Sequence, residues 1–275
     1  NERRAFFRKT FVDEATGKTI CSWYDAERKG QLIDTQTSYA LPLAFHVVDG
    51  DLQKKMAAHL AAAIKTPMAG YPAYSLLTGF IGTAWISKAL SDNGMSEEAY
   101  RLLQYEGYPS WLYPVKNGAT TIWERLNSYT VKDGFGENNS MNSFNHYSFG
   151  AVASWMYNYS LGICRDEKSP GFKHFILKPE VDPTRGITHA EGYYDSMYGR
   201  ISSRWQYTDS GIRYEFTVPA NTTASLYLPA PAVSFISENG KPLKKASGVR
   251  YVSADKELHH LELASGSYQF DIKQK

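Results

Sequence analysis

The spacing of apolar residues changes once along this chain, near residue 168, and the change limits the folds available to it. Before that point apolar residues recur every three to four positions, which is typical of helices with one buried face. After it they alternate with polar residues, which is typical of strands with one buried face. The sequence therefore predicts a multidomain α-then-β protein, with an all-α region at 1–168 and an antiparallel β-sandwich at 169–275.

The clearest helical pattern lies at 50–65, where Leu52, Met56, Leu60 and Ile64 recur every four residues. Residues spaced in this way share one face of a helix, so the segment is predicted to be an amphipathic helix.

Three further segments of the first region favour helices. The segment 77–94 ends in Asn-Gly, a common helix stop, and 96–107 is expected to have Ser96 as its N-cap and Gly107 as its C-cap. The segment 148–163 is apolar nearly all round, which predicts a buried helix.

Alternating segments separated by short turn sequences make up the second region. Such runs, bounded by Gly, Pro, Asn and Asp, predict antiparallel strands joined by turns. The predicted strands lie within 199–207, 212–218, 224–230 and 259–272. The boundary between the two regions falls near Ser169-Pro170-Gly171.

The composition narrows the possible partners. Of 275 residues, 43% are hydrophobic, and 30 basic side chains against 28 acidic ones leave a formal charge of +2. No Lys/Arg stripe is long enough to follow a phosphate backbone, so nucleic acid is not an expected partner. Cys21 and Cys164 lack metal-ligand spacing and are expected to be ordinary buried thiols.

No feature of the sequence indicates a membrane, a metal or a cofactor. No apolar run approaches the ~18 residues of a membrane span, and residues 1–11 lack the apolar core of a secretory signal. The histidines form no convincing metal cluster, and 134–139 fails the dinucleotide-loop pattern, so it is expected to be a loop near the site. The compartment is not decided by these observations.

Glu124 is the acid that most calls for an explanation, because it stands between Trp123 and Arg125 in "GATTIWERLNSY". A carboxylate beside a tryptophan is either a paired structural acid, with Arg125 as the partner, or it faces a cavity. His146 raises the same question, since a lone histidine either contacts a ligand or lies in the core. With 20 tyrosines and 6 tryptophans, the chain has many rings that suit either sugar platforms or core packing.

Several segments together resemble the carboxyl-terminal half of the α-L-rhamnosidases of glycoside hydrolase family 78. They are "DTQTSYALPLAF", "LLTGFIGTAWISKALSDNG", "YRLLQYEGYPSWLYPVKNGATTIWERLNSY", "MNSFNHYSFGAVASWMY" and "PGFKHFILKPEVDP". The block 108–150 is the most specific, because Trp, Glu, Asn and His recur there in a fixed order. The resemblance implies part of an (α/α)6 toroid that carries the active site, followed by a β-sandwich.

The resemblance also implies a site. Enzymes of the family invert the anomeric centre with two carboxylic acids, which the mechanism holds roughly 6.5 to 9.5 Å apart so that a water fits between them. By resemblance Glu124 is the general base and His146 contacts the sugar. The other implied substrate-binding residues are Trp123 as a pocket wall, Trp111 as a sugar platform or core residue, and Asn145, which organises the loop.

The chain departs from the family at the general acid. The family pattern is Asp-x-x-x-Arg-x-Glu-Arg-x-x-Trp, whereas the pair Glu27-Arg28 has Gln31 in place of the tryptophan and Asp25 in place of the first arginine. Twelve helices of ~11 residues together with their loops also need well over 165 positions, and only about half that number of helices can be recognised in the sequence. The chain is therefore expected to be half a toroid, inactive by itself, which the missing N-terminal half of the enzyme or a neighbouring chain completes.

Three functions remain open at this point. The first is a rhamnosidase catalytic half that acts on a rhamnose-containing glycoside or polysaccharide. The second is another toroidal enzyme such as a polysaccharide lyase, in which Tyr and His abstract a proton and Glu124 is structural. The third is a non-catalytic carbohydrate-binding piece, for which a strand row containing Trp205 and Tyr207 is the available aromatic surface.

Overall fold

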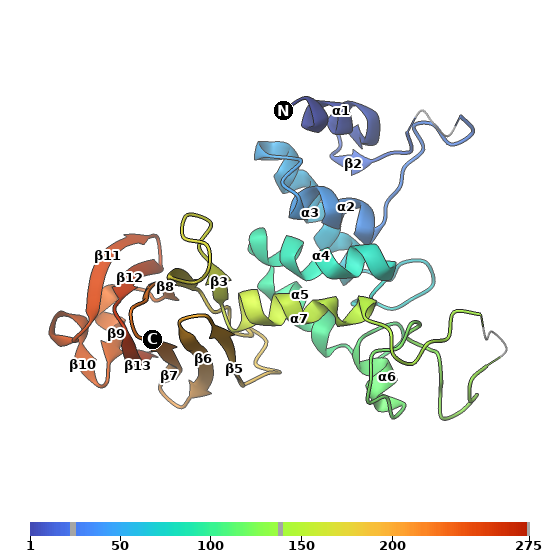
Figure 1. Ribbon diagram of the computed structural model, residues 1–275. Helices are drawn as coiled ribbons and strands as arrows, with labels where there is room; N and C mark the ends of the chain where they lie inside the picture. The colour runs from blue at the N-terminus through green and yellow to red at the C-terminus, as the bar shows by residue number, and fades with distance from the viewer. Residues whose placement is uncertain (23–25, 137–139, 274–275) are drawn as a thin grey trace. The chain divides into compact units, whose positions relative to one another are not determined.

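The computed structural model describes residues 1–22, 26–136 and 140–273, and it consists of two compact units (Figure 1). The first unit is Asn1–Ala153 and the second is Ser154–Lys275. This division lies earlier than the change of pattern at residue 168, because strand β3 (Ile163–Arg165) already belongs to a sheet of the sandwich. Asp25 and part of the expected loop 134–139, residues 137–139, lie outside the described residues.

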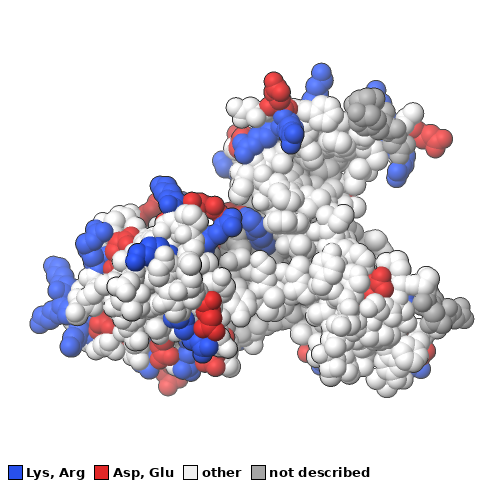
Figure 2. All heavy atoms as spheres, in the orientation of Figure 1, with Lys and Arg blue, Asp and Glu red and all other residues white. Residues whose placement is uncertain are grey.

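The first unit is mainly helical. Its elements are α1 (Glu2–Phe11), the hairpin β1 (Val12–Asp13) and β2 (Lys18–Thr19), α2 (Gln36–Ala44), α3 (Gly50–Lys65), α4 (Gly79–Asp92), α5 (Ser96–Gln104), α6 (Leu112–Lys116) and the 3₁₀ turn η1 (Ser148–Ala151). Charged side chains gather around α1 and β2 on the face drawn in Figure 2, whereas the surface over α4 and α7 (Val152–Trp155) carries few of them.

The predicted amphipathic helix is confirmed, since α3 spans Gly50–Lys65. Met56, Leu60 and Ile64 are fully buried, as their four-residue spacing requires. The next predicted helix is confirmed as α4, with Asn93 as its C-cap.

The predicted ends of α5 are wrong. Met95 occupies the N-cap position and Ser96 is the first helical residue, without a side-chain cap. The backbone becomes extended at Tyr105, with φ −68° and ψ 128°, so the helix stops before Gly107 can cap it. Local cap preferences were therefore overridden by the path that the chain takes toward Tyr108.

The predicted buried helix at 148–163 is present in a different form. It consists of η1, then α7, then the π-helical turn η2 (Met156–Ser160). Complete burial is not observed, because Tyr157 is 44% exposed. The apolar composition thus predicted a helical segment correctly, but the prediction that it is buried on every side was wrong.

Helices α2 and α4 approach closely at Gly82. A methyl group built at Gly82 would lie 2.4 Å from Thr37 Oγ1, which is less than any normal van der Waals contact. The Thr37 hydroxyl donates to the carbonyl of Thr78 at 2.9 Å and so ties α2 to the residue before α4. This contact fixes the start of α4, where Gly79 and Phe80 lie.

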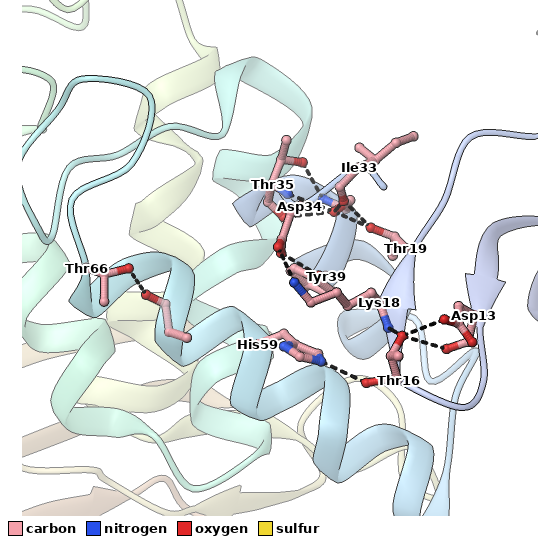
Figure 3. Close-up of polar contacts among 12 residues, drawn as sticks. Asp13, Thr16, Lys18, Thr19, Ile33, Asp34, Thr35, Tyr39, His59 and Thr66 are labelled. Atoms are coloured by element: carbon pink, nitrogen blue, oxygen red, sulfur yellow. Dashed lines mark hydrogen bonds and ion pairs between the residues drawn. The ribbon is translucent and has the colours of Figure 1, made fainter. Parts of the chain in front are cut away.

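A polar network joins the N-terminal hairpin to α2 and α3 (Figure 3). The Asp34 carboxylate accepts a hydrogen bond from Tyr39 at 2.6 Å and forms an ion pair with Lys18 at 2.7 Å. Burial opposes ionisation of Asp34, but the hydrogen bonds from Lys18 and Tyr39 hold its pKa below the usual range. Burial, with the neighbouring Asp34 charge, raises the pKa of Tyr39 strongly. His59 on α3 stacks on the Tyr39 ring at 5.4 Å.

The second unit is a sandwich of two sheets. Its strands are β3, β4 (His174–Leu177), β5 (His189–Ser196), β6 (Gly199–Thr208), β7 (Gly211–Val218), β8 (Thr223–Pro229), β9 (Ile236–Glu238), β10 (Lys241–Pro242), β11 (Val249–Asp255), β12 (Leu258–Leu263) and β13 (Gly266–Lys273), with 3₁₀ turns η3 (Val233–Phe235) and η4 (Leu243–Lys245). The six-stranded sheet has the order β10-β9-β13-β7-β6-β5 and the five-stranded sheet the order β11-β12-β8-β4-β3.

The predicted strands are confirmed, and their pairing is antiparallel with one exception. Strand β4 runs parallel to β8, with Phe175 opposite Ala224. Period-two patterns show which face of a strand is buried and carry no information about its direction, so the sequence did not reveal this pair.

Alternate residues of the six-stranded sheet fill the core of the sandwich. Trp205, Tyr214 and Phe270 are fully buried, and the Trp205 indole donates to the Ser160 carbonyl at 2.9 Å. The Tyr207 hydroxyl donates to the Asp182 carbonyl at 2.8 Å. Trp205 is thus a core residue, so the aromatic row it was expected to form with Tyr207 is not a surface for sugars.

Cys21 and Cys164, both among the described residues, form no disulfide and are half-exposed, so the expectation of buried thiols is wrong. Cys164 lies on β3 and its thiol is within hydrogen-bond reach of the Asn158 carbonyl, at 2.9 Å. Over the described residues, none of the helices combines the length and the apolar character that crossing a bilayer needs.

Candidate active site

Two irregular segments that are separate in sequence run side by side in the first unit. The backbone N–H of Glu124 donates to the Ser143 carbonyl at 2.8 Å, and the N–H of His146 donates to the Ile122 carbonyl at 2.8 Å. These two bonds bring the predicted residues Glu124 and His146 onto adjoining segments.

The Glu124 side chain is half-buried and held from one side. Its Oε2 accepts a hydrogen bond from the backbone N–H of Ser143 at 3.0 Å. Together with the reverse bond from the Glu124 N–H, this contact closes a small ring around residues 124 and 143. The carboxylate is therefore fixed in direction by main-chain atoms, while Oε1 has no hydrogen-bond partner among the described residues.

Glu124 lines an open pocket of about 380 Å³, which we call the Glu124 pocket. Aromatic, aliphatic and polar groups from α4 and from the loops on either side form its walls. The lining residues are Tyr71, Leu76, Leu77, Gly79, Phe80, Tyr108, Pro109, Glu124, Arg125, Leu126, Asn127, Met141 and Phe149. The pocket has the size and the mixed lining that are typical of small-molecule sites.

Arg125 lines the same pocket and is anchored to the facing segment. Its Nε donates to the Met141 carbonyl at 2.8 Å and its NH2 donates to Asn142 Oδ1 at 3.3 Å. These bonds fix a guanidinium group in the lining that it shares with Glu124.

Two tyrosines of the pocket were missed by the sequence analysis. Tyr71 and Tyr108 meet edge to face at 5.7 Å, and Tyr113 packs on Tyr108 at 5.2 Å. Burial, with a further contribution from Tyr71, raises the pKa of Tyr108, although Arg125 opposes the shift. The Tyr108 phenol therefore keeps its proton at neutral pH and can donate as well as accept hydrogen bonds.

A repeated triplet was the available signal for these tyrosines. Gly70-Tyr71-Pro72 and Gly107-Tyr108-Pro109 have the same three residues, and the two tyrosines come together in the Glu124 pocket. A Gly-Tyr-Pro triplet predicts a turn that presents its central residue, so the repetition pointed to two similar loops.

His146 does not line the Glu124 pocket. Its half-buried ring stacks on Phe80 at 4.8 Å and on Tyr147 at 5.4 Å, and Nδ1 accepts from the Ser148 N–H at 3.4 Å. His146, the predicted sugar contact, is thus connected to the pocket of Glu124, the predicted base, in two ways. Its ring packs on Phe80, which lines the pocket, and its backbone N–H bonds to the Ile122 carbonyl.

The predicted tryptophans lie beneath the site. Trp123 is 6% exposed and packs edge to face on Phe144 at 5.2 Å. Trp111 is 8% exposed, and its indole N–H donates to the Phe149 carbonyl at 2.8 Å. Neither is among the residues that line the Glu124 pocket.

Asn145 is exposed, and its backbone N–H donates to Ser143 Oγ at 3.2 Å. The bond shapes the loop next to the residue that holds Glu124. Across the parts of the chain that the structure describes, no three His, Cys, Asp or Glu side chains are grouped to hold a metal ion.

The chain is similar in fold to solved structures of α-L-rhamnosidases. The Streptomyces avermitilis α-L-rhamnosidase complexed with L-rhamnose matches 98% of the chain with a TM-score of 0.80 and 32% identity, over 23% of its own length. The Dictyoglumus thermophilum α-L-rhamnosidase matches 98% with a TM-score of 0.78 and 26% identity, over 28% of its length. The fold is thus that of a six-hairpin glycosidase domain followed by a β-sandwich.

The family follows from the sequence matches. Residues 1–160 match the bacterial α-L-rhamnosidase six-hairpin glycosidase domain, and residues 162–242 match the bacterial α-L-rhamnosidase C-terminal domain. The chain belongs to the bacterial α-L-rhamnosidase family. Curated α-L-rhamnosidases of Streptomyces avermitilis and Alteromonas sp. (strain LOR) are 35% and 34% identical over 90% and 87% of the chain. The chain spans only 22% and 24% of their lengths.

Proposed function

We propose that the chain is the carboxyl-terminal part of an inverting α-L-rhamnosidase that hydrolyses terminal α-L-rhamnosides, with Glu124 as the general base. The observation that carries the proposal is the Glu124 carboxylate in an open pocket, with Oε2 fixed by the Ser143 N–H. The similarity to the Streptomyces avermitilis enzyme, which was solved with L-rhamnose, supports the choice of sugar.

The geometry suits the role of a base. An inverting glycosidase needs a carboxylate that removes a proton from water as the water attacks the anomeric carbon. The backbone bond to Oε2 orients the group, and Oε1 keeps its lone pairs for the proton. The fixed direction of the carboxylate lowers the entropy cost of the reaction.

The rest of the pocket suits a 6-deoxy sugar. The phenols of Tyr71 and Tyr108 offer hydrogen bonds to ring hydroxyls, while Phe80 and Met141 offer apolar surface to a methyl group. His146 is proposed to act next to the pocket, where its stacking on Phe80 holds the wall in place. Trp111 and Trp123 are proposed to support the site from the core.

The general acid is proposed to come from a part of the enzyme outside these 275 residues. The small share of the curated relatives that the chain spans supports this, as does the departure of the Glu27 segment from the acid motif. The remainder of the glycosidase domain, or a neighbouring chain, would place that acid on the opposite face of the sugar. The chain by itself is therefore expected to be inactive.

A lyase that acts on uronates would need surplus positive charge at its pocket. Among the described lining residues Arg125 is the sole cation, and Glu124 offsets it. The pocket therefore gives no support to the second function considered above.

The proposal is tested by Glu124→Gln in the complete natural protein, with Glu106→Gln as the matched control. Glu106 is an exposed acid that pairs with Lys116 at 2.7 Å and lies outside the pocket lining. Removing a general base should lower kcat on an aryl α-L-rhamnoside by about 10²-fold or more, with little change in KM. Glu106→Gln should leave both constants unchanged.

Product analysis by NMR adds an independent measurement, because inversion of an α-L-rhamnoside first releases the β anomer. A well-folded Glu124→Gln variant with near-normal kcat would remove Glu124 from the reaction. Initial release of the α anomer would refute the inverting mechanism while leaving the glycosidase assignment intact.

A further inference from the structure

The outer face of the six-stranded sheet carries a second open groove, of about 660 Å³, which we call the sheet groove. It lies entirely within the second unit and crosses β5, β6, β7 and β13. The side chains that point to this face alternate with the buried core residues of the same strands. The groove is therefore separate from the Glu124 pocket, which belongs to the first unit.

Small hydroxyl residues form the floor of the sheet groove. The strand register places Ser202 opposite Thr217, and Thr217 opposite Ser267. Within the described parts of the chain, these three hydroxyls make no hydrogen bond to other protein groups, although each can donate one and accept two. The floor is thus a row of hydroxyls that can form hydrogen bonds with a ligand.

A row of larger polar side chains runs beside the floor. Glu191 lies opposite Arg204, Arg204 opposite Glu215, and Glu215 opposite Gln269. Arg204 joins the row by ion pairs, at 3.2 Å to Glu215 Oε2 and at 3.6 Å to Glu191 Oε2. These contacts hold the planar carboxylate and guanidinium groups in place along one side of the groove.

The row of hydroxyls ends at Tyr193 of β5, which lies opposite Ser202 of β6. The Arg200 guanidinium stacks on the Tyr193 ring with 3.6 Å between its central carbon and the ring centroid. Asp195 binds the same guanidinium through two hydrogen bonds, of 2.8 and 3.1 Å. This end of the groove therefore brings together an aromatic ring, a cation and an acid.

The charges of the lining narrow the chemistry of a ligand. Among the residues that line the groove, Glu191 and Glu215 balance Arg200 and Arg204, and Asp195, which is not in the lining, adds one acid at the end of the groove. Acidic and basic side chains lie beside one another over β6 and β7 in Figure 2. A phosphate or uronate ligand needs excess positive charge, and an amine needs excess negative charge. An apolar ligand would leave the floor hydroxyls without partners.

We propose that the sheet groove binds a neutral glycan chain. Sugar hydroxyls donate and accept hydrogen bonds as the three floor hydroxyls do, and neighbouring hydroxyl pairs fit planar Glu, Arg and Gln groups. Strands lie about 4.8 Å apart, so the row from Tyr193 to Ser267 extends over roughly 14 Å. A short oligosaccharide therefore fits the row better than one sugar does.

Such a site would hold a polymeric substrate without taking part in its hydrolysis. Binding through a second module raises the effective concentration of the glycan near the first one. The consequence is a difference between substrates, because polymeric glycosides benefit from the groove and small aryl rhamnosides do not.

Affinity gel electrophoresis of the complete natural protein tests the proposal. The probes are three neutral polysaccharides, arabinoxylan, galactomannan and xyloglucan, with polygalacturonate as the acidic counterpart. Excess free L-rhamnose is present throughout to occupy the Glu124 pocket. We expect at least one neutral polysaccharide to retard the protein and polygalacturonate to have no effect.

Two variants place that binding in the groove. Ser202→Gln fills the floor and should weaken binding about tenfold or more, whereas Thr217→Val removes one hydroxyl and should weaken it about two- to tenfold. Ser253→Gln is the matched control, because Ser253 is an exposed residue of β11 outside the groove. This variant should bind the polysaccharide normally. All three variants should hydrolyse a small aryl rhamnoside at the wild-type rate.

The proposal is overturned if no neutral polysaccharide retards the protein, or if polygalacturonate alone does so. Normal binding by a folded Ser202→Gln variant would also overturn it. If melting curves show that Ser202→Gln does not fold, Thr217→Val decides, because valine suits a strand and keeps the shape of threonine. Near-normal hydrolysis by Glu124→Gln with retained polysaccharide binding would refute the proposed base and leave this site untouched, so the two proposals fail separately.

Discussion

Replacing Trp111 by phenylalanine separates a structural tryptophan from a sugar platform. The substitution removes the indole donor to the Phe149 carbonyl, at 2.8 Å, inside the core. Loss of a buried hydrogen bond costs about 1 to 3 kcal/mol, and the space left by the smaller ring adds on the order of 1 kcal/mol. We therefore expect the free energy of unfolding to fall by roughly 2 to 4 kcal/mol.

The melting temperature should fall by at least about 4 °C, because 1 kcal/mol corresponds to roughly 2 to 4 °C in domains of this size. The KM for an aryl α-L-rhamnoside should stay within about twofold of the wild-type value, since Trp111 lies outside the pocket lining. Differential scanning calorimetry and initial-rate kinetics measure the two quantities in the same preparations.

Trp85→Phe is the matched control for this substitution. Trp85 is a half-buried residue of α4 that packs on Phe45 at 4.5 Å, and within the described residues its indole donates no hydrogen bond. The Trp85→Phe variant should lose less free energy of unfolding than the Trp111→Phe variant. A Trp111→Phe protein with unchanged melting temperature and a strongly raised KM would refute the structural role and restore the platform.

Two more predictions concern stability. Gly82→Ala should destabilise the protein by about 1 to 3 kcal/mol in denaturant titrations, because the new methyl group meets Thr37 Oγ1. The same substitution made in a Thr37→Ala background should cost less, and an equal cost there would contradict this cause. The lowered pKa of Asp34 stabilises the fold above about pH 4 and the raised pKa of Tyr39 does so below about pH 10. Below about pH 4 and above about pH 10 the melting temperature of the wild type should therefore fall, and that of Asp34→Asn should fall less. Identical profiles of melting temperature against pH in the two proteins would contradict the role of the network.

The positions of the helices and strands could be predicted because burial leaves a periodic trace. Helix α3 and strands β6 and β7 each show their buried face directly in the sequence. The cap of α5 and the direction of β4 could not be predicted in this way. Both depend on where the chain goes next, and residues distant in sequence decide that.

In the candidate site, too, some residues could be predicted from the sequence and others could not. Glu124 was found because an acid next to a tryptophan is chemically conspicuous, and the family resemblance gave it a role. Tyr71 and Tyr108 were missed, because a tyrosine is equally at home in a core and in a pocket. The depth of Trp111 likewise depends on its bond to Phe149, a residue that no local pattern connects with it.

The atom that orients Glu124 belongs to the main chain and to no side chain. Nineteen of the twenty amino acids supply an N–H at position 143, and proline alone does not. The bond to Glu124 therefore requires only that residue 143 is not proline, whereas the bond from the Asn145 N–H also requires the Ser143 hydroxyl. A score of residue identity alone would therefore not register the contribution of this main-chain N–H to the direction of the carboxylate.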